Sequence, residues 1–121
     1  MSVKATIRGS GNVAIVDLSG RITLGEGSGT IRSAIKDLLI EGKKNILLNL
    51  AGVTYLDSAG LGELVGSYAS VGNAGGQIKL LNTQGKVKDL LAVTKLYTVF
   101  VTFENEAEAV RSFAATGGTG A

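Results

Sequence analysis

The sequence has no cysteine, histidine, proline or tryptophan in its 121 residues. Without cysteine, a disulfide framework and a thiolate metal site are both excluded. Without histidine, the chain lacks the commonest metal ligand and the usual proton shuttle near neutral pH. These absences exclude zinc hydrolases, Ser-His-Asp and Cys-His enzymes, haem proteins and iron–sulfur proteins. We therefore expect a protein that binds rather than catalyses, with no metal and no cofactor.

Charge and long apolar runs are also scarce. The chain has 12 basic and 10 acidic side chains, a formal net charge of +2, and its basic residues are scattered singly apart from Lys43 and Lys44. This pattern lacks the basic stripe of a nucleic-acid-binding protein. Apolar runs such as residues 46–48 fall far short of the roughly 20 residues of a membrane span, and the first residues lack the apolar core of a signal peptide. We expect a cytoplasmic protein that neither enters a membrane nor contacts nucleic acid directly.

The pattern that is present indicates one domain of alternating strands and helices. The length fits a single domain that buries roughly two-thirds of its surface on folding. Alternating apolar residues on both sides of a Gly-Ser-Gly-Asn turn predict a β-hairpin over residues 3–18, with a brief extension over 20–24. An apolar stripe at helical spacing then predicts a helix that Ser28 or Thr30 caps and Gly42 ends. The stripe consists of Ile31, Ala34, Ile35, Leu38 and Leu39.

The rest of the chain continues this alternation. A mostly apolar strand over residues 45–50 leads through a loop, 51–57, into a helix over 58–72. A strand over 77–82, a short helix around Val87 and Leu91, and a strand over 99–103 follow. Asn105 and Glu108 have the spacing of a capping box, which predicts a final helix. The expected fold is therefore α/β: one domain over residues 3–114, with a mixed, mostly parallel sheet, an N-terminal hairpin and about four α-helices, and a flexible C-terminal tail over 115–121.

The most informative segment is the junction between the strand at 45–50 and the helix at 58–72. Asp57 and Ser58 open this helix, and ordinary N-capping accounts for such residues there. Ser58, Gly62, Gly66 and Ser70 recur every four residues, mostly away from the expected core stripe, which is Leu61, Leu64, Val65, Tyr68 and Val71. A glycine inside a helix costs about 1 kcal/mol relative to alanine. Either packing against another part of the same chain or the close approach of a partner explains the glycines.

The junction resembles a known family. The most specific similarity is the run Asp57-Ser58-Ala59-Gly60-Leu61-Gly62, in a strand–loop–helix context. Further similarity lies in residues 20–22, 50–53, 75–78 and 103–109. Over residues 3–114 the chain resembles the STAS domain, and in particular the bacterial anti-sigma factor antagonists.

The resemblance implies a STAS fold and a protein that switches partners. Antagonists of this kind bind an anti-sigma factor that is also a serine kinase, and so regulate sigma factor-dependent transcription. Phosphorylation at the serine that corresponds to Ser58 releases them, and a PP2C-type phosphatase resets them. The residues expected to contact the partner are Tyr55, Asp57, Ser58, Ala59, Gly60, Gly62, Glu63 and Gly66, with Glu26 from an earlier loop. The protein itself is expected to be no enzyme, and to be a monomer or a weak homodimer.

Other interpretations remain beside this one. Many family members carry an acidic residue after the early glycine motif, where this chain has Thr23 and the loop 25–29, with Glu26 as the candidate substitute. A second hypothesis is therefore a STAS scaffold, or a subunit of a stress-signalling or lipid-transport complex, that is never phosphorylated. Tyr55 can be a half-buried side chain or a partner contact. A nucleophilic role for Ser58 lacks a histidine base, and the loop 25–29 lacks the Gly-Lys-(Ser/Thr) end of a phosphate-binding loop.

Overall fold

The computed structural model describes residues 3–23, 28–83 and 85–119. Its elements alternate as the sequence predicts. They are, in chain order, β1 (Lys4–Ser10), β2 (Val13–Ile22), α1 (Ser28–Ile40), β3 (Asn45–Leu56), α2 (Ser58–Asn73), β4 (Gln77–Leu81), α3 (Gly85–Val93), the 3-10 helix η1 (Leu96–Thr98), β5 (Thr102–Phe103) and α4 (Glu106–Thr119).

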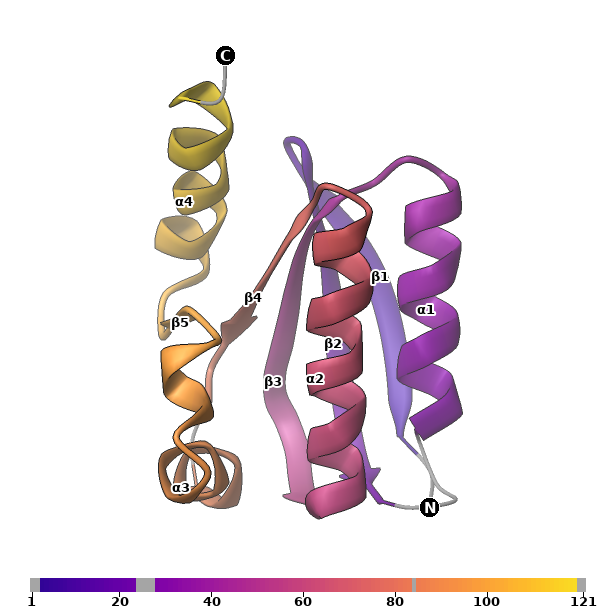
Figure 1. Cartoon of the computed structure of the whole chain (residues 1–121), viewed down its shortest axis with the longest axis vertical. Coiled ribbons are helices and arrows are strands. Elements are labelled where there is room, and N and C mark those ends of the chain that lie inside the picture. Colours follow the sequence, from indigo (N-terminus) through magenta and orange to yellow (C-terminus); the bar gives the residue numbers. More distant parts are fainter. Residues whose placement is uncertain (1–2, 24–27, 84, 120–121) are drawn as a thin grey trace.

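The strands form one five-stranded sheet in the order β1-β2-β3-β4-β5. The β1–β2 hairpin is antiparallel, and every later neighbouring pair is parallel. Helices α1 and α2 run side by side on one face of the sheet (Figure 1), where α1 packs on β1 and β2, and α2 packs on β3 and β4. The predicted α/β architecture, with a mixed, mostly parallel sheet and an N-terminal hairpin, is confirmed.

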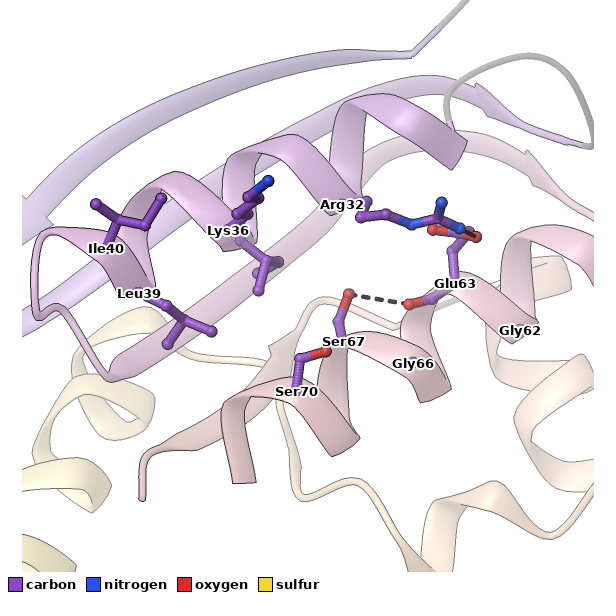
Figure 2. Close-up of a pocket in the computed structure, with 10 residues that line it drawn as sticks. Arg32, Lys36, Leu39, Ile40, Gly62, Glu63, Gly66, Ser67 and Ser70 are labelled. Carbon is purple, nitrogen blue, oxygen red and sulfur yellow. Dashed lines mark hydrogen bonds and ion pairs between the residues drawn. The ribbon is translucent and has the colours of Figure 1, made fainter. Parts of the chain in front are cut away.

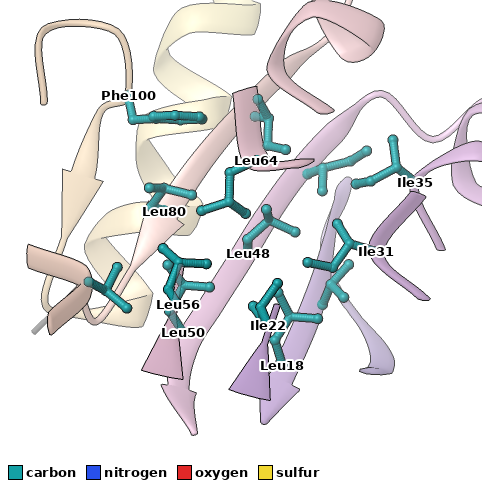
Figure 3. Close-up of a cluster of buried hydrophobic side chains, with 14 of the residues drawn as sticks. Leu18, Ile22, Ile31, Ile35, Leu48, Leu50, Leu56, Leu64, Leu80 and Phe100 are labelled. Atoms are coloured by element: carbon teal, nitrogen blue, oxygen red, sulfur yellow. The ribbon is translucent and has the colours of Figure 1, made fainter. Parts of the chain in front are cut away.

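Two hydrophobic clusters lie on opposite faces of the sheet. In β3, Ile46 and Leu48 join the larger cluster beneath α1 and α2, whereas Leu47 between them joins the smaller one beneath α4. Successive side chains of a strand point to opposite faces, so a strand covered on both sides is apolar throughout. Figure 3 shows the larger cluster, where Leu64 of α2 lies against the sheet and Ile31 and Ile35 enter from α1.

The segment over residues 51–57 is the main error in the predicted elements. It was expected to be a loop, but β3 continues through it to Leu56. The extension pairs with the end of β2, from Ser19 opposite Gly52 to Ile22 opposite Leu56, after shifts in the β2–β3 register. The sequence misleads here because most small and polar residues of this segment are exposed, so no apolar pattern marks a strand and pairing with β2 provides the extension.

The C-terminal part of the chain also differs from the prediction. The last strand was expected over residues 99–103, but only Thr102 and Phe103 pair with β4, and η1 occupies the chain just before them. The last helix continues to Thr119 and so includes most of the segment expected to be a flexible tail. Its start is as predicted, because the Glu108 amide donates to the Asn105 side chain at 2.9 Å. Residues 120–121 of the expected tail lie outside the described residues.

Helix α2 buries part of the predicted stripe. The prediction is confirmed at Leu61, Leu64 and Val71. It is wrong at Val65 and Tyr68, which are 37% and 41% exposed. Ser67 is buried instead, and Tyr68 lies at the edge of the core with its ring centre 5.5 Å from that of Phe100. The helix is thus rotated so that Ser67, rather than Val65 or Tyr68, lies in the core.

Candidate functional site

The site predicted from the sequence lies where β3 meets α2. The carboxyl ends of β2 and β3 and the first residues of α1 and α2 gather at one edge of the sheet (Figure 1). The Asp57 amide donates to the Ile22 carbonyl at 3.3 Å, which joins the start of α2 to the end of β2. Binding sites in sheets of this type occur at the carboxyl ends of the strands. The candidate site therefore has a rigid base formed by two adjacent strands.

Asp57, rather than Ser58, is the N-cap of α2. Asp57 has extended backbone angles, and its carboxylate accepts from the Gly60 amide at 2.8 Å. Ser58 is the first residue of the helix, and it is exposed. The capping explanation therefore accounts for Asp57 and leaves Ser58 without a capping role. The hydroxyl of Ser58 is open to solvent at a helix N-terminus, where the backbone favours negative charge.

Gly60, which the resemblance implies as a partner contact, is buried in the free protein. A Cβ at Gly60 would collide with the Ile22 carbonyl and with the Leu56 and Ile22 side chains. This position needs glycine because α2 crosses the end of β2 at very short range. Gly60 therefore positions the helix, and the expectation that it contacts a partner is not supported by its burial.

The other small residues of α2 remain uncovered. Ser58, Gly62, Gly66 and Ser70 are all exposed, and Ala59 is partly exposed. Apart from the adjacent residues and the nearby backbone of α2 itself, no heavy atom of the described residues lies within 4 Å of the position that a Cβ would take at Gly62 or Gly66. Packing within the chain therefore does not explain these two glycines. They leave a low strip along α2 that begins at Ser58.

Glu63 lies beside this strip and has a partner in the same chain. Its carboxylate is 2.6 Å from the Arg32 guanidinium of α1, and the Glu63 side chain is only 16% exposed. Glu63 was predicted to contact a partner protein, but here it joins two helices of the chain. Figure 2 shows Arg32 and Glu63 facing each other between α1 and α2.

Tyr55 and Glu26 are the remaining predicted contacts. Tyr55 is partly buried, as one of its two interpretations expects, and the Arg21 guanidinium lies 4.8 Å from the centre of its ring. Tyr55 also borders a hollow of about 270 Å³ with Leu90 and Val93 of α3. Thr23 is partly buried, whereas Glu26 lies outside the described residues. The role of all these residues in partner binding stays a prediction.

Two features near or beyond the site were not predicted. Helix α1 contributes Arg32, Lys36 and Ile40 to a groove beside the strip of small residues. Their spacing places them on one side of a helix, but nothing in the sequence shows that α2 runs beside that side. On the opposite face of the sheet, Arg8 holds the carboxylates of Asp17 and Glu106 at 2.6 Å each.

The ion pairs of Arg8 shift the titration of all three groups. Hydrogen bonds from the guanidinium hold the pKa of Asp17 and the pKa of Glu106 below their ordinary values, and the two carboxylates raise the pKa of Arg8. The network joins β1, β2 and α4, and it lies on the sheet face that α2 does not cover. It therefore holds the fold together away from the candidate site.

A comparison with protein families matches residues 4–109 to the model of the STAS domain. The chain belongs to the STAS domain family. The resemblance carried by residues 57–62 is thereby confirmed, and this match covers most of the chain. Within residues 3–23, 28–83 and 85–119 of this STAS domain, no helix has the length and hydropathy that a membrane span requires.

Individual relatives agree with this assignment. The STAS domain is 28% identical over 67 residues to an anti-sigma F factor antagonist of Paenibacillus polymyxa, an alignment that spans 55% of this chain and 57% of the relative. An anti-sigma factor antagonist from Mycobacterium paratuberculosis has a similar structure, with a TM-score of 0.81, 19% identity, and coverage of 93% of this chain and 95% of that one. The phosphorylated form of the Bacillus cell fate determinant SpoIIAA matches with a TM-score of 0.70, 19% identity, and coverage of 90% and 98%. At these identities the structural matches show the fold.

Proposed function

We propose that the protein is an anti-sigma factor antagonist that binds an anti-sigma factor with serine kinase activity, and that phosphorylation at Ser58 releases it. The protein acts by binding and by being modified, and not by turnover. The observation that carries this proposal is the exposed Ser58 at the first position of α2, beside an aspartate that already caps the helix. The name of the Paenibacillus polymyxa relative supports the same function.

The chemistry of the switch follows from the position of Ser58. The Ser58 Oγ attacks the γ-phosphorus of ATP, the bond to the ADP oxygen breaks, the hydroxyl proton passes to a base of the kinase or to water, and ADP is released. The phosphoserine carries a charge of about −1.5 to −2 at pH 7. The N-terminus of α2 stabilises this anion in the free protein. A PP2C-type phosphatase restores the hydroxyl when water takes up the phosphoryl group and inorganic phosphate leaves.

The phosphate weakens the complex because of what surrounds Ser58. Ala59, Gly62 and Gly66 keep the neighbouring surface low, so a partner that fits it closely has no space for a phosphate. The carboxylate of Asp57 adds a second negative charge beside it. The same modification is therefore tolerated in the free protein and unfavourable in the complex, and only such a difference shifts a binding equilibrium.

Calorimetric titration of three variants against each purified anti-sigma factor of the source genome tests the proposal. We expect wild type and Ser58→Ala to bind one of them and Ser58→Glu to lose at least about tenfold in affinity, which is about 1.4 kcal/mol. Ser33→Glu, on the exposed side of α1, is the matched charge control and should bind as wild type does. Equal binding by Ser58→Ala and Ser58→Glu contradicts the switch.

Intact-mass spectrometry after incubation with the bound anti-sigma factor and ATP tests the modification itself. We expect wild type to gain one phosphate and Ser58→Ala to gain none. An unmodified wild type that still binds contradicts the phosphorylation and favours the second hypothesis, a STAS scaffold or a subunit of a stress-signalling or lipid-transport complex.

A further inference from the structure

A groove runs between α1 and α2, directly beside the low strip of α2 (Figure 2). Its volume is about 570 Å³. Ile35, Leu39 and Ile40 form its apolar part, and the side chain of Ile40 is 73% exposed. Ile40 and the partly buried Leu39 therefore give the groove an accessible apolar end that an occupant can contact.

The charges of the groove are distributed unevenly. Arg32 and Glu63 neutralise each other at the end of the groove nearer to the start of α2. Lys36, in the middle of the α1 wall, is exposed and has no ion-pair partner in the described part of the chain. The open charge of the groove is therefore positive, and an occupant that places a carboxylate opposite Lys36 complements it.

The dimensions of the groove fit a helix. The lining residues extend from Arg32 to Ile40 on α1 and from Gly62 to Ser70 on α2, about 12 Å along each helix axis at 1.5 Å per residue. This length matches the i, i+3/i+4 and i+7 anchors by which an amphipathic helix lies in a groove. The space above Gly62 and Gly66 allows such a helix to come close to the backbone of α2.

The same charges disfavour a second copy of the chain as the occupant. Two grooves that face each other across a twofold axis bring their central residues together, so Lys36 would lie near the Lys36 of the other copy. Like charges that meet in an interface lower its affinity. An acidic amphipathic helix is the occupant that the groove favours.

We infer that this groove receives an amphipathic helix of the anti-sigma factor, with aliphatic side chains over Gly62 and Gly66 and a carboxylate against Lys36. This inference rests on the proposed function, because Gly62 lies one helical turn beyond Ser58 on the same strip. It makes the groove a second contact area of the partner. The contact at Ser58 senses phosphorylation, and the groove contributes affinity and selects partners with the matching acidic helix.

Two variants alter the groove and leave Ser58 unchanged. Gly66→Leu fills the space above α2, and Lys36→Glu reverses the open charge. In titrations with the anti-sigma factor that wild type binds, we expect each to lower affinity about tenfold or more. The matched controls are Gly72→Leu, on the same helix outside the groove with open space at its Cβ position, and Lys43→Glu, beyond the end of α1. Both controls should stay within about twofold of wild type, because they leave the groove unchanged.

The outcomes separate this inference from the proposed function. If Ser58→Glu abolishes binding but Gly66→Leu and Lys36→Glu bind as wild type does, the groove is not a contact area and the inference is overturned, while the proposed function stands. If no anti-sigma factor binds wild type, both are wrong. If circular dichroism shows that Gly66→Leu does not fold, Lys36→Glu becomes the deciding variant. Replacing the acidic residue of the partner helix that faces Lys36 by lysine should restore the binding that Lys36→Glu loses.

Discussion

Asp57 and Ser58 are adjacent, yet their side chains have different environments. The extended backbone of Asp57 turns its carboxylate back over the first turn of α2, where the Gly60 amide lacks a partner within the helix. Ser58 is already helical and is exposed. This difference leaves Asp57 to cap the helix, so the proposed phosphorylation of Ser58 would not remove the cap.

The capping role of Asp57 predicts a measurable loss of stability. We expect Asp57→Ala to lower the free energy of unfolding by about 1 kcal/mol, because the Gly60 amide loses its acceptor. Asp57→Asn retains an acceptor oxygen and should stay close to wild type. Urea unfolding followed by circular dichroism measures both variants. A loss in Asp57→Asn as large as in Asp57→Ala would show that charge, and not capping, is responsible.

At the scale of the element, α2 uses glycine for two opposite purposes. Gly60 allows the helix to cross the end of β2, and the space beside it is full. Gly62 and Gly66 have open space beside them, so their small size serves nothing inside the chain. These two glycines therefore lower the intrinsic stability of α2, although no contact inside the chain requires them. Such a cost is expected where a surface is shaped for a partner.

Alanine substitutions at Gly60 and Gly62 should therefore change the free energy of unfolding in opposite directions. We expect Gly62→Ala to raise the free energy of unfolding by about 0.5–1 kcal/mol, because alanine favours the helix and meets no neighbour. Gly60→Ala should lower it by about 2 kcal/mol or more, because its Cβ overlaps the Ile22 carbonyl. Thermal unfolding of both variants under one set of conditions makes the comparison. A destabilising Gly62→Ala would mean that the strip is covered in the free protein.

At the scale of the whole molecule, different helices cover the two faces of the sheet. Helices α1 and α2 cover the face that contains the candidate site, and α4 closes the other with Ala109 and Phe113. The ion pairs of Arg8 with Asp17 and Glu106 connect the β1–β2 hairpin to the first turn of α4. Because this network lies across the sheet from α2, changes in it should affect stability and leave the partner surface intact.

The network predicts a pH dependence of stability. The pKa values of Asp17 and Glu106 are held below their ordinary 3.8 and 4.5 in the folded protein, so their ion pairs stabilise it fully above those values. This contribution is lost as the pH falls through the lowered pKa values of the folded state. We expect Arg8→Met to be less stable than wild type by about 1 kcal/mol at pH 7, a small value because the groups are partly exposed.

Urea unfolding at pH 7 and pH 3 measures this difference. The difference in the free energy of unfolding between wild type and Arg8→Met, here called the gap, should be smaller at pH 3. At that pH the ion pairs of Asp17 and Glu106 contribute less to the stability of wild type. Arg111→Met, which removes another exposed cation from α4, is the control and should show no gap at either pH. A gap that is equally large at both pH values would rule out the ion pairs as its cause.

Local patterns in the chain were enough to predict the order of the elements and the location of Ser58 at the start of a helix. Apolar spacing, the glycine at residue 42 and the cap at Asn105 act within a few residues, so they are readable without a fold. Gly42 has the positive φ of 81° expected of a helix end, and the Leu39 carbonyl accepts from its amide. The motif at residues 57–62 identified the family for the same reason, because its residues are contiguous.

Contacts between distant segments determined the features that the sequence did not predict. The strand continues over residues 51–56 only because the end of β2 lies beside it, and Gly60 is buried only because that same strand end crosses α2. Glu63 pairs with Arg32, which is 31 residues away, and together α1 and α2 create a groove that neither helix has alone. Such features depend on which surfaces the folded chain brings together, and the spacing of residues along one element does not contain that information.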